Sequence, residues 1–213
     1  MNIDVQLIEK VVKKVLTDVE SACPADDYTY GIFETMDDAI EASAKAQKEY
    51  MNYSMADRER FVNGIREVVC QKENLEYMSK LAVEESGMGA YEYKLIKNRL
   101  AAEKSPGIED LTTEALSGDD GLTLVEYCPF GVIGAIAPTT NPTETVICNS
   151  IGMLAGGNTV VFNPHPAAIK TSVFAINLLN EASLEAGGPA NIAVTVENPT
   201  LETSNIMMKH KDI

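Results

Sequence analysis

Three short apolar stretches in the second half of the chain constrain its fold more than any other feature. They are VIGAIA (132–137), TVVFN (159–163) and IAVTV (192–196). VIGAIA is apolar without alternation, as expected for a strand whose two faces are both covered. Each stretch is followed by a segment with helical periodicity, at 142–155, 167–186 and 200–209. Strands that alternate with helices in this way build a parallel sheet through right-handed crossovers. We therefore predict an α/β fold with a parallel, Rossmann-like sheet.

The predicted sheet is short for a nucleotide-binding domain. Doubly wound domains usually have about five or six strands. The chain ends at Ile213, where a further strand is expected. We therefore expect the sheet to be incomplete in this chain.

The first half of the chain is predicted to be mainly helical. A helix begins near Thr35 or Asp37, and a second one begins near Asp57 and ends at the glycines of 87–89. A third spans roughly 90–103, the polar stretch 108–120 resembles a loop, and LTLVEY (122–127) alternates as a strand.

The first twenty residues form a separate amphipathic segment. Val12, Val15 and Leu16 are among the apolar residues that share one helical face within 3–19, and a polar linker with Pro24 follows at 21–32. Three alternatives are open: a first helix docked on the domain that begins at residue 33, a detachable helix that binds a partner's groove, and a membrane-surface helix. The linker favours the second. The polar face has charges of both signs and lacks Trp and Phe, which disfavours the third.

Composition excludes several classes of protein. The net charge of −15 argues against a nucleic-acid binder, because phosphate contacts need basic surfaces. No apolar run is long enough to span a membrane, so no membrane partner is expected. The four cysteines are far apart and form no CxxC, so we predict no metal site and a reducing, cytoplasmic location. Among them, Cys148 is predicted to lie in the core.

The candidate site lies where two predicted strands end. Pro138–Asn141 follows the first strand, and Asn163–Pro166 lies at the end of the second. Open α/β sheets bind ligands at this edge. Asn141 precedes Pro142, so it is either a helix N-cap or an amide donor for a developing oxyanion. His165 lies between two prolines and either shapes the loop or touches a ligand; a role as general base is less favoured. The carboxylates of 84–85 are predicted to be a solvated face.

PFGVIGAIAPTTNPT (129–143), AGGNTVVFNPHP (155–166) and the earlier ESGMGAYEYKLIKNRLAAEKSPGIEDL (85–111) together resemble the aldehyde dehydrogenase superfamily, and specifically its CoA-acylating branch. The resemblance covers about 33–213. It implies an oxidoreductase that converts a short-chain aldehyde, CoA and NAD into acyl-CoA and NADH through a cysteine thioester. The segment 1–20 resembles the encapsulation peptides of bacterial microcompartments, which implies a shell protein as partner of 3–19. Residues 118–130 resemble a strand used for oligomerisation, which implies a homo-oligomer when the protein is complete.

The resemblance also assigns roles to residues of the two strand ends. Asn141 matches the amide of the oxyanion hole. Ala137, Pro138, Thr139 and Thr140 match the strip along the NAD cofactor, and Asn163, His165 and Pro166 match its adenosine side. Asn163 departs from the lysine that is usual there, which fits a pocket that also takes CoA.

None of the four cysteines matches the nucleophile of the family. We expect it beyond Ile213, so this chain alone is expected to be inactive. The alternatives are a non-catalytic fragment that docks to a shell or binds nucleotide, a hydrolytic aldehyde dehydrogenase, and an unrelated nucleotide-binding protein. The last is disfavoured because no GxGxxG follows a strand.

Overall fold

The structure, a computed structural model, describes residues 30–213. A four-stranded parallel sheet has the order β1-β6-β5-β4. Its strands are β1 (Ile32–Phe33), β4 (Val132–Ala137), β5 (Thr159–Pro164) and β6 (Ala193–Val196). The predicted parallel α/β sheet is confirmed. β1 was not predicted, because two residues carry no periodicity, and it brings residue 32 of the predicted linker into the sheet. The segment 1–20 and the linker up to residue 29 lie outside the described residues.

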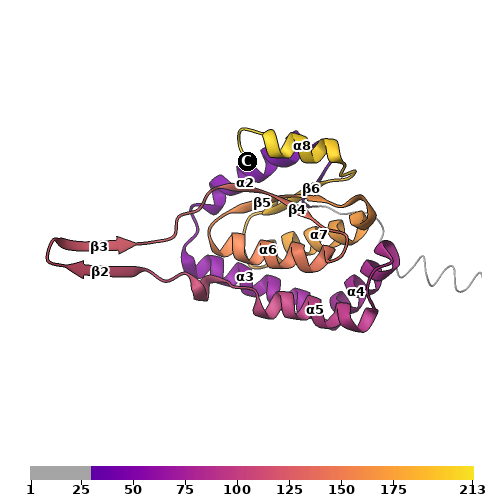
Figure 1. Ribbon diagram of the computed structural model, residues 1–213, viewed down its shortest axis with the longest axis horizontal. Coiled ribbons are helices and arrows are strands. Elements are labelled where there is room, and N and C mark those ends of the chain that lie inside the picture. Colours follow the sequence, from indigo (N-terminus) through magenta and orange to yellow (C-terminus); the bar gives the residue numbers. More distant parts are fainter. Residues whose placement is uncertain (1–29) are drawn as a thin grey trace, which may run out of the picture.

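Helices cover both faces of this sheet (Figure 1). α2 (Met36–Tyr50) and α8 (Leu201–Lys209) lie on one face, and α6 (Pro142–Ala155) and α7 (Ile169–Glu185) lie on the other. α3 (Met55–Cys70), α4 (Lys72–Ser86) and α5 (Tyr91–Lys104) pack outside α6 and α7 as a further layer. The two faces of the sheet bury separate apolar clusters, the larger around Phe162 and Ile147 and the smaller around Val161 and Ile40.

The helical first half differs from the prediction at two positions, the N-cap of α3 and Gln71. Thr35 caps α2, and its hydroxyl accepts from the N–H of Asp38 at 3.2 Å. The N-cap of α3 is Ser54, while Asp57 completes a capping box from the third helical position. The predicted helix from Asp57 to Gly87 is two helices, because Gln71 adopts an extended backbone (φ −58°, ψ 138°) between α3 and α4.

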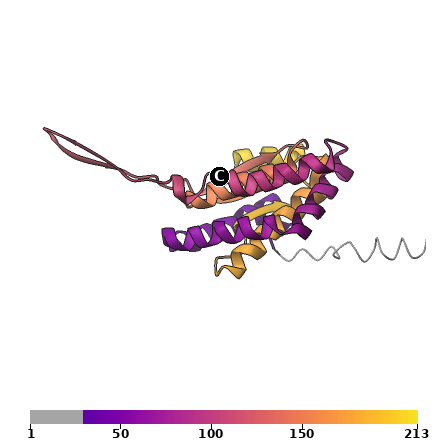
Figure 2. The same ribbon diagram turned by 90° about the horizontal axis from the view of Figure 1, so that it is seen from below.

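A long hairpin leaves the body of the molecule (Figures 1 and 2). It consists of β2 (Glu114–Gly118) and β3 (Gly121–Val125), which pair antiparallel around the turn at 119–120. The prediction of a loop over 108–120 is therefore wrong: 108–110 form a 3-10 turn and 114–118 form a strand. Every residue of β2 and β3 is exposed. The family resemblance implies a strand in oligomer contact here, and that role stays a prediction.

Candidate functional site

The two predicted strand ends lie side by side at the carboxyl edge of the sheet. β4 and β5 are neighbours, with Ala137 opposite Pro164 in the register. The N–H of His165 donates to the carbonyl of Ala137 at 2.9 Å and ties the two loops together. The residues selected from the sequence therefore line one continuous edge, which is where open α/β sheets bind ligands.

Asn141 stands at the first turn of α6 but does not cap it. It occupies the N-cap position, yet its side chain makes no capping hydrogen bond. Its Oδ1 instead accepts from Nζ of Lys97 on α5 at 2.5 Å. Among residues 30–213 its Nδ2 group makes no hydrogen bond. The capping interpretation is thus wrong for the side chain, and the amide N–H groups stay available to a ligand.

A buried ion pair lies next to Asn141. The side chain of Lys94 is 3% exposed, and its Nζ donates to the carbonyl of Thr140 at 2.7 Å and to Oε1 of Glu144 at 3.3 Å. Lys97 is a second cation, 3.9 Å from the same carboxylate. The hydroxyl of Thr143 donates to Asn98 on α5 at 2.6 Å. These groups fix the first turn of α6 to α5.

Sequence reasoning missed these α5 and α6 side chains. Lys94, Lys97 and Glu144 were assigned no role, although the two lysines lie in the stretch that carries the family resemblance. Their spacing of three residues was an available signal, because it places both ammonium groups on neighbouring turns of one helix face.

Thr139 and Thr140, which are predicted to line the cofactor, differ in how far their side chains are exposed. Oγ1 of Thr139 is buried and has no hydrogen-bond partner among residues 30–213. Thr140 is exposed and lines a hollow of about 410 Å³ with Tyr93 and Lys97 of α5. Ala137 is buried and Pro138 is exposed. A buried hydroxyl without a hydrogen-bond partner, such as that of Thr139, calls for an explanation, and a polar ligand is one group that would satisfy it.

Asn163 holds helix α8 against the sheet. Its side chain is buried, and Nδ2 donates to the carbonyl of Thr200 at 3.2 Å and to Oγ of Ser204 at 2.6 Å. Its Oδ1 accepts from the hydroxyl of Thr203 at 2.6 Å. These three bonds occupy the amide, so the structure gives Asn163 a packing role at the start of α8. The cofactor contact assigned by resemblance stays a prediction.

His165 shapes the loop at the end of β5. The ring is exposed, and Nδ1 accepts from the N–H of Ala167 at 3.1 Å, which caps the 3-10 turn η2 (Pro166–Ala168). This contact supports the loop-shaping interpretation. Pro166 is exposed at the same edge.

The N-terminus of α7 is already occupied by a carboxylate. Glu85, at the end of α4, accepts from the backbone N–H of Lys170 and of Thr171, each at 2.8 Å. The prediction that this carboxylate belongs to a solvated face is wrong. Helix N-termini are common phosphate sites. Here the carboxylate takes that place, which agrees with the absence of a glycine-rich phosphate motif.

The cysteines of the described part carry no assembled reactive site. Cys148 is exposed on α6, so the prediction that it lies in the core is wrong. Cys128 is exposed as well. Burial, and secondarily the charge of Glu103, raises the pKa of the Cys70 thiol. A raised pKa lowers the thiolate fraction and makes Cys70 a poor nucleophile.

Two absences concern only residues 30–213. In this range, no group of three or more His, Cys, Asp or Glu residues is arranged to hold a metal ion. No helix of the same range has the length and apolar content needed to cross a membrane.

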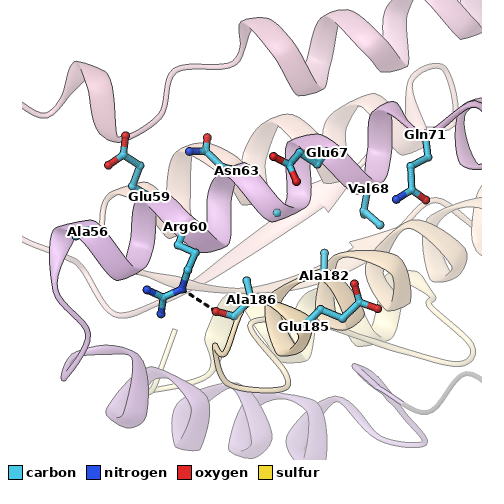
Figure 3. Close-up of a pocket in the computed structure, with 11 residues that line it drawn as sticks. Ala56, Glu59, Arg60, Asn63, Glu67, Val68, Gln71, Ala182, Glu185 and Ala186 are labelled. Atoms are coloured by element: carbon cyan, nitrogen blue, oxygen red, sulfur yellow. Dashed lines mark hydrogen bonds between the residues drawn. The ribbon is translucent and has the colours of Figure 1, made fainter.

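A separate hollow of about 580 Å³ lies between α3 and α7 (Figure 3). Arg60 reaches across it, and its Nε donates to the carbonyl of Ala186 at 2.8 Å. Glu59, Glu67 and Glu185 give the rim a negative charge. None of the predicted site residues lines this hollow.

The fold is an α/β fold with a parallel sheet, and the candidate site lies at the carboxyl edge of that sheet. Residues 15–213 match the model of the aldehyde dehydrogenase family. The chain therefore belongs to the aldehyde dehydrogenase family.

Three relatives illustrate the branch of the family to which this chain is similar. Acetaldehyde dehydrogenase (acetylating) EutE of Salmonella typhimurium is 44% identical over 210 residues, which are 98% of this chain and 44% of the relative. The structure of Rhodopseudomonas palustris propionaldehyde dehydrogenase with bound CoA and an acylated cysteine is 63% identical, with a TM-score of 0.84 over 86% of this chain and 42% of that one. A propionaldehyde dehydrogenase from the Clostridium phytofermentans fucose utilisation bacterial microcompartment is 60% identical, with a TM-score of 0.83 and coverage of 86% and 42%. This chain thus spans less than half the length of each.

Proposed function

We propose that the protein, at the full length its gene encodes, is a CoA-acylating aldehyde dehydrogenase. It would convert a short-chain aldehyde, CoA and NAD into acyl-CoA and NADH. The observation that carries this proposal is the amide of Asn141, which is held by its oxygen and makes no capping bond. The acylated cysteine and bound CoA of the Rhodopseudomonas palustris relative support it.

The residues of this chain would act on the charge that develops at the aldehyde. When a thiolate adds to the carbonyl carbon, the oxygen becomes an oxyanion, and the N–H of Asn141 would donate to it. Such a donor is worth roughly 10²–10³ in rate. The cysteine that supplies the thiolate is proposed to lie beyond Ile213. The thioester would then pass its acyl group to the CoA thiol.

The carboxyl edge of the sheet fits a dinucleotide in some respects. NAD, when bound, supplies the acceptor for the hydride that aldehyde oxidation releases. Ala137, Pro138, Thr139 and Thr140 would line the cofactor, and the unpaired hydroxyl of Thr139 is a polar group that such a ligand could satisfy. His165 and Pro166 are exposed where the adenosine side is proposed. Asn163 would contribute by fixing α8, because its amide is occupied.

The proposed surroundings follow from the relatives and from the first residues of the sequence. We propose that the protein works in the cytoplasm inside a bacterial microcompartment, since a similar enzyme comes from one. The segment 3–19 would bind a shell protein. The exposed hairpin of β2 and β3 would join an oligomer, and a solution mass equal to a single chain would exclude this.

The activity is tested by following NADH formation from propanal, NAD and CoA with the full-length protein. We expect turnover that requires CoA and yields propanoyl-CoA. Asn141→Ala should lower kcat by roughly 10²–10³. Asn205→Ala, an exposed asparagine on α8, is the matched control and should leave kcat unchanged. Turnover without CoA that releases free acid would indicate the hydrolytic reaction instead, and the absence of turnover with CoA would reject the proposal.

A further inference from the structure

We propose that Lys97 is the positioning residue that sets the orientation of the Asn141 amide for catalysis. This inference rests on the proposed function, in which that amide donates to the oxyanion. Lys97 belongs to α5, whereas the amide that it would orient belongs to Asn141 at the start of α6. Lys97 acts through Asn141 and is not itself placed on the reacting atoms.

The chemistry of the contact fixes which way the amide points. An asparagine side chain can turn about its last bond, which exchanges the oxygen and the NH₂ group. An ammonium group has three donors and no acceptor, so it attracts only the oxygen. Nζ of Lys97 lies 2.5 Å from Oδ1 of Asn141. The NH₂ group must then point away from Lys97, and the turned orientation would set two donors against each other.

The backbone at Asn141 is held from the same helix. Lys94, one turn before Lys97, donates to the carbonyl of Thr140 at 2.7 Å. The residue that precedes Asn141 is therefore fixed to α5 as well. The side chain of Asn141 and the backbone carbonyl before it are thus held by two different lysines of α5.

Glu144 keeps Lys97 in place. Its carboxylate lies 3.9 Å from Lys97 and 3.3 Å from Lys94. Among residues 30–213, the ammonium groups of Lys94 and Lys97 pair with one carboxylate, which leaves one positive charge without a partner of its own beside Asn141. Lys97 is about half exposed, so water reaches its side chain. A positive charge on the oxygen side of an amide polarises it and strengthens its N–H groups as donors to an oxyanion.

The test is a double-mutant cycle between Lys97→Met and Asn141→Ala in the full-length protein, with propanal, CoA and NAD. Methionine keeps the apolar stem of lysine and removes the donor. We expect Lys97→Met to lower kcat between about 10-fold and about 10²-fold, less than the loss of the amide itself. KM for propanal should change by less than about 2-fold, because ground-state contacts are kept. In the Asn141→Ala background the same change should cost less than about 2-fold, since the group it orients is gone.

Two further variants separate positioning from a general loss of structure. Lys104→Met removes an exposed lysine from the last turn of the same helix and should leave kcat and KM unchanged. Lys97→Arg keeps a cation that only donates, and it should recover part of the lost kcat. A structural effect of removing Lys97 would persist in the Asn141→Ala background, whereas a positioning effect would not.

Each outcome decides between distinct explanations. Independent, multiplicative losses for Lys97→Met and Asn141→Ala would overturn the positioning role, because Lys97 would then act without Asn141. Equal kcat for Lys97→Met and Lys104→Met would also overturn it, with the proposed function intact. A wild-type protein without CoA-dependent turnover would overturn the proposed function, and the positioning role with it.

Discussion

Replacement of the buried Lys94 with methionine should lower the free energy of unfolding by about 3 kcal/mol. The Lys94 side chain is 3% exposed, and methionine keeps most of its apolar stem. What is lost is two charge-assisted hydrogen bonds, to Thr140 and to Glu144. Such bonds contribute about 1.5–3 kcal/mol each. Removing one partner of a buried pair costs about 3–5 kcal/mol, and we expect the lower end because Lys97 remains 3.9 Å from Glu144.

Urea unfolding of the full-length protein, followed by circular dichroism, measures this loss of unfolding free energy. Urea is uncharged, so it does not screen the ion pair. Lys45→Met is the matched control, because Lys45 forms a 2.9 Å pair with Glu41 in which both side chains are mostly exposed. Exposed pairs are screened, so this control should lose less than about 0.5 kcal/mol.

The double variant Lys94→Met/Glu144→Met adds a second test. It removes both the ammonium group and the carboxylate. The single variant Lys94→Met, by contrast, leaves the buried carboxylate of Glu144 without its nearest cation. We expect the double variant to be more stable than Lys94→Met alone. If Lys94→Met unfolds at the same urea concentration as Lys45→Met, or if the double variant loses the sum of both single losses, the reasoning about the buried pair is refuted.

Two other predictions concern the cysteines and the N-terminal segment. Because burial raises the pKa of Cys70, its thiolate fraction at a given pH lies below that of an ordinary thiol. Iodoacetamide should therefore label Cys148, which is exposed, before Cys70. Labelling of Cys70 should rise as the pH approaches its pKa. Mass spectrometry of the labelled peptides at several pH values checks this, and equal rates would contradict it. Replacing Ile8 and Val12 with glutamate should abolish co-purification of the protein with microcompartment shells while leaving CoA-dependent turnover unchanged. Unchanged co-purification would remove the targeting role of 3–19.

The sheet could be predicted because its strands carry their own signals. VIGAIA and TVVFN are apolar runs bounded by glycine, proline and asparagine, and the helix at 142–155 begins and ends as predicted. Glycine, proline and asparagine interrupt helices and strands through local backbone preferences. Such boundaries can therefore be recognised without knowing which other segment the strand pairs with. The adjacency of the two strand ends followed from the parallel order.

Other elements depend on contacts that no local pattern contains. The break at Gln71 is one residue in an extended conformation, with no glycine or proline to mark it. The strand at 114–118 is exposed throughout and exists because it pairs with β3. Asn163 matched a cofactor position, yet its amide is taken by a helix that begins almost forty residues later. In each case the deciding partner is elsewhere in the chain.

The α5 helix shows most clearly why only part of the candidate site could be predicted from the sequence. Ile96 of this helix is 62% exposed, whereas Lys94 and Asn98 are buried, which reverses the usual preference of apolar side chains for the interior. This inversion is physically reasonable, because the first turn of α6 presents the carboxylate of Glu144 and the hydroxyl of Thr143, and buried polar groups require partners. An apolar face of α5 would fill the same space but would leave those groups unpaired. It would also leave the Asn141 amide without a donor-only neighbour to orient it. The polar face of α5 therefore serves stability and the proposed catalysis through the same contacts, and only the fold brings its partners together.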